Sequence, residues 1–233
     1  MSDRKLNIAV IPAAGIGSRM NADRAKQMLE LAGVPLLVHT LRRFEACDAV
    51  HQVILVLQPN LTSDVLALIS RHHLKKIARV VGGGAERQDS VYRGLQVIKP
   101  ETAGIVAVHD AVRPFVRPEE IRLVIERAEA TGAALLALAA TDTIKQVKGG
   151  RVGRTLDRKR IYHAQTPQAF RYDIIRAAYD RAYTEGYWAT DDSHLVERAG
   201  HRVSVVEGSP LNIKITRPLD LRVAEAINQE YFT

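Results

Sequence analysis

The chain has 233 residues, of which 46% are hydrophobic, and a formal net charge of +7. Its length and composition fit one α/β domain spanning residues 1–233. The sequence has no apolar run near the ~20 residues of a membrane span and no signal-peptide core. We therefore expect a cytoplasmic protein with no membrane partner. The lone Cys47 leaves no intramolecular disulfide, while dispersed basic residues and an aromatic content of 5% favour small anionic substrates over nucleic acid.

Apolar runs alternate with amphipathic stretches from the start of the chain to residue 140. Runs that are apolar throughout predict buried strands at 6–11, 53–57, 77–81, 105–108 and 133–140. Apolar residues at helical spacing predict helices at 37–44, 61–69, 86–98 and 118–128. This alternation predicts a doubly wound, mostly parallel sheet, in which ligands bind beyond the carboxyl ends of the strands.

The pattern changes at Thr141, where polar residues become more frequent than apolar ones. Residues 143–147 and 152–156 flank a Gly-Gly tip and predict a β-hairpin. A polar hairpin has no core of its own, so an arm at about 141–160 either extends into solvent or packs against a partner. Beyond the arm we predict helices at 172–185, 192–198 and 219–229, and a strand at 203–206.

The loop after the first predicted strand consists mostly of small residues, among them Pro12, Ala13, Ala14, Gly15 and Gly17. Such a loop lets backbone N–H groups converge on an anion. Arg19 and Lys26 add two mobile positive charges, so the stretch predicts a cradle for a triphosphate. The spacing does not fit a P-loop, and Met20 stands where the dinucleotide fingerprint needs its third glycine. The glycines alone fit a plain strand-to-helix turn equally well.

Asp110 follows the strand predicted at 105–108, where a carboxylate can bind Mg²⁺ together with substrate phosphates. Arg113 can contact a phosphate through two parallel hydrogen bonds. The alternative for Asp110 is a cap on the next turn. We interpret His109 as structural, because attack by one phosphate on another needs no general base.

The pattern Pro-Ala-Ala-Gly-x-Gly-x-Arg-Met at 12–20, followed by Lys-Gln at 26–27, resembles the signature loop of sugar-nucleotide-type nucleotidyltransferases. More narrowly, it is similar to that of the 2-C-methyl-D-erythritol 4-phosphate cytidylyltransferase family. Further motifs follow in order at 83–91, 109–114, 157–158, 165–168, 190–192 and 212–216. The resemblance covers residues 9–224 and implies a Rossmann-like nucleotidyltransferase fold, CTP and a polyol phosphate as substrates, and Mg²⁺ as cofactor.

The resemblance also implies which residues bind the nucleotide and the metal. Backbone groups of Gly84 and Ala85, with the Ser90 hydroxyl, would recognise the cytosine base. Ala85 stands where an Asp is common in the family. Leu211 likewise stands where some members carry Asp, so the metal is assigned to Asp110 alone. Taken by itself, the segment at 83–91 is more simply interpreted as a glycine turn in which Ser90 has a structural role in the helix that follows.

For the acceptor, the resemblance implies substrate contacts from Thr143, Thr166 and Thr190. The partner subunit's Arg158 would position the acceptor phosphate and Lys214 would bridge it to the nucleotide, in a homodimer that exchanges arms. Each position has an ordinary alternative: a turn at 166–167, a helix start at 191–192 and a surface lysine at 214.

The resemblance therefore implies a Mg²⁺-dependent cytidylyltransferase with catalytic residues Arg19, Lys26, Arg158 and Lys214. It would convert CTP and 2-C-methyl-D-erythritol 4-phosphate to 4-diphosphocytidyl-2-C-methyl-D-erythritol and pyrophosphate, in non-mevalonate isoprenoid precursor synthesis. The main alternative is a ribitol-5-phosphate cytidylyltransferase, which shares the fold and the chemistry. A nucleotide-binding regulator without catalysis would release no pyrophosphate, and an RNA-binding protein would show a steep salt dependence.

Overall fold

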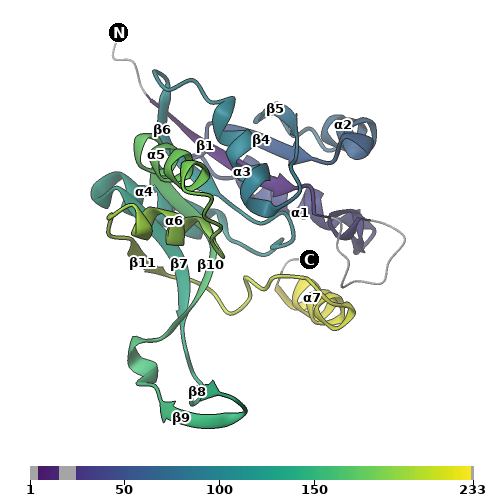
Figure 1. Ribbon diagram of the computed structural model, residues 1–233. Helices are drawn as coiled ribbons and strands as arrows, with labels where there is room; N and C mark the ends of the chain where they lie inside the picture. The colour runs from purple at the N-terminus through teal and green to yellow at the C-terminus, as the bar shows by residue number, and fades with distance from the viewer. Residues whose placement is uncertain (1–4, 16–24, 232–233) are drawn as a thin grey trace.

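The computed structural model describes residues 5–15 and 25–231 of the chain. Its main sheet has seven strands in the order β11-β7-β10-β6-β1-β4-β5 (Figure 1). Their bounds are β1 (Leu6–Ala13), β4 (Gln52–Leu57), β5 (Ile77–Gly82), β6 (Ala103–Val108), β7 (Ala133–Ala139), β10 (Tyr162–Arg171) and β11 (Ser204–Glu207). Within this sheet, every strand pair is parallel except those that β10 makes with β6 and β7. The prediction of a doubly wound, mostly parallel sheet is confirmed.

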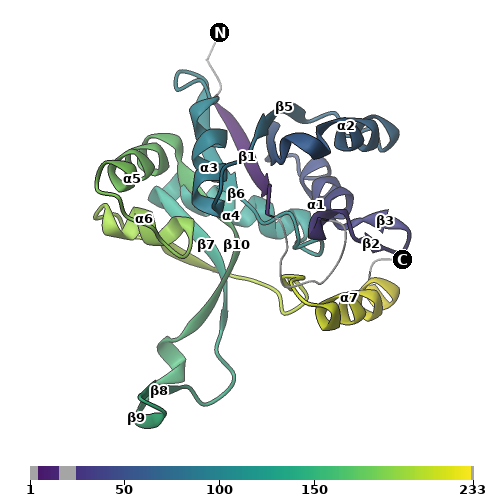
Figure 2. The same ribbon diagram turned by 45° about the vertical axis from the view of Figure 1, so that its right-hand side comes forward.

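Helices cover both faces of this sheet (Figures 1 and 2). One apolar core lies between the sheet and α1 (Leu36–Glu45), α2 (Thr62–Arg71) and α4 (Pro118–Thr131). A second core lies on the opposite face, against α3 (Arg87–Gln96), α5 (Tyr172–Thr184) and α6 (Asp192–Arg198). The strands are apolar throughout because both of their faces are covered.

The helix α4 shows how local sequence sets these elements. Pro118 occupies its first position, where the missing N–H costs nothing, and the Glu120 carboxylate accepts a hydrogen bond of 2.8 Å from the backbone nitrogen of Arg117. Ile121 and Val124, three residues apart, are completely buried against the sheet. The capped start therefore fixes which face of the helix meets the core.

A small third core lies beside the end of β1. The pair β2 (Glu30–Leu31) and β3 (Val34–Pro35) packs there with α7 (Pro218–Tyr231), around Leu31, Leu36, Phe115, Ile215 and Ala224. The single-turn helix η2 (Lys26–Met28) immediately precedes this pair, and a second one, η3 (Pro59–Leu61), precedes α2. This packing connects the C-terminal helix to the segment that carries Lys26.

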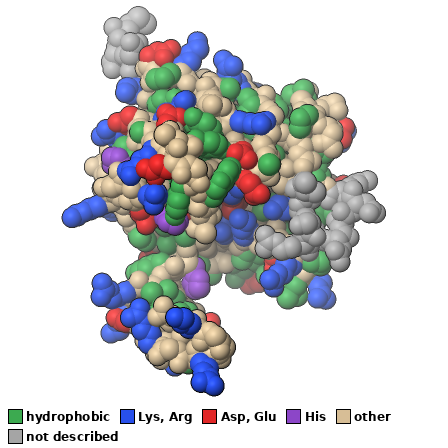
Figure 3. Space-filling view, viewed as in Figure 1, with side chains coloured by type: hydrophobic (Ala, Val, Ile, Leu, Met, Phe, Trp, Pro, Cys, Tyr) green, Lys and Arg blue, Asp and Glu red, His purple; other side chains and the backbone are tan. Residues whose placement is uncertain are grey.

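The predicted arm is present as the hairpin β8 (Lys145–Lys148) and β9 (Arg151–Thr155), followed by η4 (Arg158–Arg160). It extends away from the body of the protein, and Lys and Arg side chains are prominent on it (Figures 1 and 3). Every residue of both strands is exposed, including Val147 and Val152. The first strand lies at 145–148 where 143–147 was predicted, and the second at 151–155 where 152–156 was predicted.

The strand β10 is not among the predicted elements, although it lies in the middle of the sheet between β6 and β7. Gln165, Thr166 and Gln168 are buried in it. Because these residues are polar and Pro167 interrupts them, the segment has neither the apolar run nor the alternation that marks a strand.

Within the described residues, no helix is long and apolar enough to cross a membrane.

Candidate active site

A cleft opens at the carboxyl ends of β1 and β6, beside the start of α3. Ten of the residues singled out from the sequence line it together: Pro12, Ala13, Ala14, Gly15, Lys26, Gly84, Ala85, Ser90, Asp110 and Lys214. Gly17 and Arg19 lie outside the described residues. Gln27, Glu86, Arg87, Ala111 and Val112 complete the lining. The position matches the rule that ligands bind beyond the carboxyl ends of parallel strands.

The end of β1 is held by Gln27, a residue for which no role was predicted. Gln27 is 1% exposed, and its side-chain nitrogen donates a hydrogen bond of 2.6 Å to the Ala13 carbonyl. Lys26 lies against Gly15, with its Nζ 3.8 Å from the point where a Cβ of that glycine would stand. Lys26 therefore places a positive charge beside the small-residue loop, and Gln27 holds the start of that loop by a hydrogen bond.

The glycines at 83 and 84 permit a close approach between this loop and α3. A Cβ at Gly83 would overlap the Ala14 side chain, and one at Gly84 would overlap Asp89. The Gly84 nitrogen donates to the Ser90 hydroxyl at 3.2 Å, and that hydroxyl donates to the Glu86 carbonyl at 3.2 Å. Ser90 thus shapes the turn by its own hydrogen bonds, as the simpler reading of this segment requires.

Asp110 is 6% exposed and stands among three cations. Its carboxylate lies 3.0 Å from Arg87 Nε, 3.5 Å from Arg113 Nε and 2.8 Å from Lys214 Nζ. Burial alone would raise the pKa of Asp110, but these positive charges outweigh it and hold the pKa well below the usual value. The carboxylate is therefore ionised at neutral pH, and the group as a whole is positive and suited to phosphates.

Arg87 contacts two carboxylates of the site, a role that was not predicted for it. Besides Asp110, it makes two hydrogen bonds of 3.0 and 2.8 Å to the carboxylate of Asp192. Asp192 is completely buried and also accepts a hydrogen bond of 2.5 Å from the Tyr179 hydroxyl. The only sequence signal is its place in the motif 83–91, because its partner lies 105 residues further along the chain.

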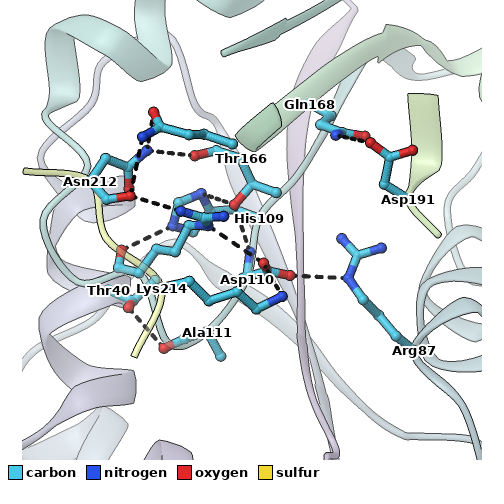
Figure 4. A network of polar contacts seen from close by, with 12 residues as sticks. Thr40, Arg87, His109, Asp110, Ala111, Thr166, Gln168, Asp191, Asn212 and Lys214 are labelled. Atoms are coloured by element: carbon cyan, nitrogen blue, oxygen red, sulfur yellow. Dashed lines mark hydrogen bonds and ion pairs between the residues drawn. The ribbon is translucent and has the colours of Figure 1, made fainter. Parts of the chain in front are cut away.

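Behind Asp110 a chain of hydrogen bonds runs into the protein (Figure 4). Thr166 lies between the Asp110 backbone nitrogen and His109 Nδ1, at 3.1 Å from each. His109 is completely buried, and burial lowers its pKa to about 4. The Asn212 amide donates to the Thr166 carbonyl at 2.9 Å, and Arg113 donates to the Asn212 carbonyl at 2.8 Å. His109 is neutral and structural here, as predicted.

The other predicted residues do not line this cleft. Arg113 and Thr166 contact Asp110 from within the protein. Thr143 is exposed at the root of the arm, and Arg158 is exposed with its guanidinium donating to the Thr141 carbonyl at 2.8 Å. Thr190 is exposed immediately before Asp191, which caps α6. Thr143 and Arg158 therefore belong to the arm and not to the lining of this cleft.

Three comparisons with known proteins agree. The family model for 2-C-methyl-D-erythritol 4-phosphate cytidylyltransferase matches residues 7–230. The enzyme of that name from Pelotomaculum thermopropionicum is 49% identical over 221 residues, which is 94% of this chain and 92% of the relative. The one from Bacillus velezensis is 46% identical over 221 residues, 94% of each chain.

Solved structures give the same result. The crystal structure of 4-diphosphocytidyl-2C-methyl-D-erythritol synthase from Anaerococcus prevotii matches with a TM-score of 0.86 and 30% identity, over 97% of this chain and 96% of that one. The 2-C-methyl-D-erythritol 4-phosphate cytidylyltransferase from Thermus thermophilus matches with a TM-score of 0.79 and 33% identity, over 97% and 99%. The chain belongs to the 2-C-methyl-D-erythritol 4-phosphate cytidylyltransferase family.

Proposed function

We propose that this cleft transfers the cytidylyl group of CTP to 2-C-methyl-D-erythritol 4-phosphate, with release of pyrophosphate, as a step of non-mevalonate isoprenoid precursor synthesis. Membership of the family supports both substrates. The observation that carries the mechanism is the convergence of Lys26, Asp110 and Lys214 beside the small-residue loop at 12–15. The ribitol 5-phosphate alternative is not favoured, because the family model and the relatives named above all carry the methylerythritol name.

In this proposal the triphosphate lies along the loop that follows β1. Backbone N–H groups near Ala14 and Gly15 would hold the phosphates, and Lys26 would stabilise charge that builds on the α-phosphate and on the leaving pyrophosphate. The cytosine would lie against Gly84 and Ala85, which contact it through the backbone alone. Chemistry of this kind consists of positioning and of charge stabilisation.

The acceptor would enter from the other side of Asp110. In-line displacement places the attacking phosphate oxygen opposite the leaving pyrophosphate. Because the loop after β1 holds the pyrophosphate, the acceptor must approach from the β10 and β7 side of β6 in the strand order. Lys214 lies at this border, 2.8 Å from Asp110, and Thr190 precedes α6 on the acceptor side.

Mg²⁺ fits this site through Asp110, an ionised carboxylate at the edge of the cleft. Among the described residues no three His, Cys, Asp or Glu side chains gather as a metal site, so the proposal gives the ion one protein oxygen beside the phosphate oxygens. When bound, it would neutralise charge on the triphosphate. Arg87 and Arg113 keep Asp110 ionised and in place, and Lys214 turns from Asp110 towards the acceptor phosphate.

The proposal includes a homodimer in which each arm reaches the other subunit. The arm residues 141–160 include seven Lys and Arg against two Asp, and their strands are exposed within one chain. A basic arm suits a position beside anionic substrates. In such a dimer the partner subunit's Arg158 would complete the acceptor side.

The test is pyrophosphate release from CTP and Mg²⁺ with either methylerythritol 4-phosphate or ribitol 5-phosphate. We expect strong preference for methylerythritol phosphate, measured as kcat/KM for each acceptor at saturating CTP. Equal or better use of ribitol phosphate would overturn the assigned substrate while leaving the triphosphate cradle in place. Omitting Mg²⁺ and adding a chelator should abolish release.

A further inference from the structure

The first turn of α3, whose Arg87 lines the cleft, is joined by hydrogen bonds to residues 187–192, a segment far away in the sequence. This turn begins with Arg87 and Gln88, shortly after the glycines at 83 and 84, and both Gly84 and Arg87 line the cleft. Arg87 binds Asp192 through its two terminal guanidinium nitrogens, and Asp192 is the first residue of α6. Arg87 therefore connects the start of α3 to the start of α6.

Gln88 makes a second connection between the same two segments. Its side-chain nitrogen donates to the Tyr187 carbonyl at 3.0 Å, and its side-chain oxygen accepts from the Ala189 nitrogen at 3.0 Å. Gln88 is only 7% exposed, so these hydrogen bonds are shielded from water. Residues 187–192 are thus hydrogen-bonded to α3 at both ends. Gln88 binds the first end, at Tyr187 and Ala189, and Arg87 binds the last residue, Asp192.

Arg87 also carries this connection to Asp110. Its Nε lies 3.0 Å from the Asp110 carboxylate while its two terminal nitrogens hold Asp192. Figure 4 shows Asp110 between Arg87 on one side and the group formed by His109, Thr166 and Asn212 on the other. A lysine could not replace this geometry, because only a guanidinium offers a planar fork of donors and a third donor at Nε.

We propose that Arg87 and Gln88 are positioning residues for the acceptor. Their hydrogen bonds hold residues 187–192 in a fixed position relative to the first turn of α3. This inference rests on the proposed function, which places the acceptor phosphate beside Thr190. Neither side chain needs to touch the acceptor, because each acts through the segment it holds. Loss of either one would loosen the acceptor side and leave the loop at 12–15 unchanged.

The test compares Arg87→Gln and Gln88→Ala with the native enzyme in steady-state kinetics. We expect KM for methylerythritol 4-phosphate to rise about tenfold or more in both variants, because each loses buried hydrogen bonds to residues 187–192, and we expect KM for CTP to stay within about threefold in Gln88→Ala. Gln88→Ala leaves all three cations on Asp110, so it separates the fastening from any effect on the metal. Arg171→Gln, which removes an exposed ion pair with Asp173, is the matched control and should change neither KM.

Amide hydrogen exchange gives a readout that does not depend on activity. In both variants the amides of residues 187–194 should exchange at least about tenfold faster than in the native protein, while those of β1 keep their protection. Unchanged exchange in 187–194, or equal rises of both KM values in Gln88→Ala, would overturn the inference. If the proposed function is wrong, the native protein will release no pyrophosphate with either acceptor. The exchange experiment would then still test whether Arg87 and Gln88 hold residues 187–192 in place.

Discussion

The Thr166 hydroxyl accepts a hydrogen bond of 3.1 Å from the backbone nitrogen of Asp110. The same hydroxyl lies 3.1 Å from Nδ1 of His109, whose Nε2 lies 3.1 Å from the Arg113 carbonyl. Because that carbonyl can only accept, the ring carries its proton on Nε2, and Nδ1 accepts from Thr166. One hydroxyl on the antiparallel strand β10 therefore fixes the chain at the end of β6, next to the carboxylate of the site.

Thr166→Val should lower the free energy of unfolding by about 2 kcal/mol or more, because it leaves a buried N–H and a buried ring nitrogen without partners. Urea unfolding at pH 7 measures this. Thr166→Ser retains the hydroxyl and should lose about 1 kcal/mol or less, and Thr102→Val at an exposed position is the control for the threonine-to-valine change. A valine variant at position 166 as stable as the native protein would contradict the hydrogen-bond chain.

His109 should make the protein lose stability as the pH falls. Burial lowers its folded pKa from 6.5 to about 4, so between these values the unfolded chain binds a proton that the folded chain does not. Stability contributed by the neutral ring is present above pH 6.5 and is lost progressively towards pH 4. From pH 7 to pH 5 the free energy of unfolding should fall by about 2 kcal/mol from this residue alone.

Urea unfolding of the native protein and of His109→Gln at several pH values separates this contribution from the rest. The variant should show a shallower fall between pH 7 and pH 5, whatever its absolute stability. His201→Gln, at an exposed histidine, should keep the native slope. Equal slopes in the native protein and in the variant at 109 would show that this ring does not control the acid response.

The sequence predicts β6 and β7 correctly because residues such as Val106 and Leu136 form runs that are apolar on both faces. It does not predict β10, because Gln168 is buried through hydrogen bonds and not through apolar contacts. The Gln168 amide donates to Asp191 at 2.8 Å and its oxygen accepts from the Ser193 nitrogen at 2.8 Å. Both partners belong to a segment that follows α5, so the nearby sequence contains no sign of them.

The same distinction applies to the candidate site. Asp110 and Lys26 are predictable from the sequence because each stands near a loop that follows an apolar strand, where parallel sheets bind ligands. Gln27 and Arg87 are not, because each acquires its role from a partner brought close only by folding. For Arg87 that partner is Asp192, and a sequence pattern cannot specify a contact over 105 residues.

Lys26→Ala should lower kcat by about 10²–10³, the scale for the loss of one charged donor in the transition state. The lysine lies in the cleft beside Gly15, where the triphosphate is proposed to bind. Pyrophosphate release at saturating CTP and acceptor measures the effect. Lys75→Ala, at an exposed lysine outside the cleft, should keep native kcat. A kcat near the native value in the variant at 26 would remove this lysine from the mechanism.

Asp110→Asn should raise the Mg²⁺ concentration needed for half-maximal rate by about tenfold or more, because a neutral amide binds a hard cation more weakly than a carboxylate. It should also lower stability, since Arg87, Arg113 and Lys214 would face one another without the central negative charge. Thermal unfolding without Mg²⁺ separates the two effects. An unchanged Mg²⁺ dependence in a folded variant would move the metal away from Asp110.

The arm should govern the oligomeric state. Val147 and Val152 pair across the hairpin and are 55% and 62% exposed, so they form an apolar pair that a second subunit could cover. The double variant Val147→Asp, Val152→Asp should sediment as a monomer at micromolar concentration and should lose activity, because the partner subunit's Arg158 no longer reaches the acceptor. Val205→Asp, an exposed valine on β11, should leave both properties native. A native protein that sediments as a monomer at these concentrations would refute the dimer and the role of Arg158 with it.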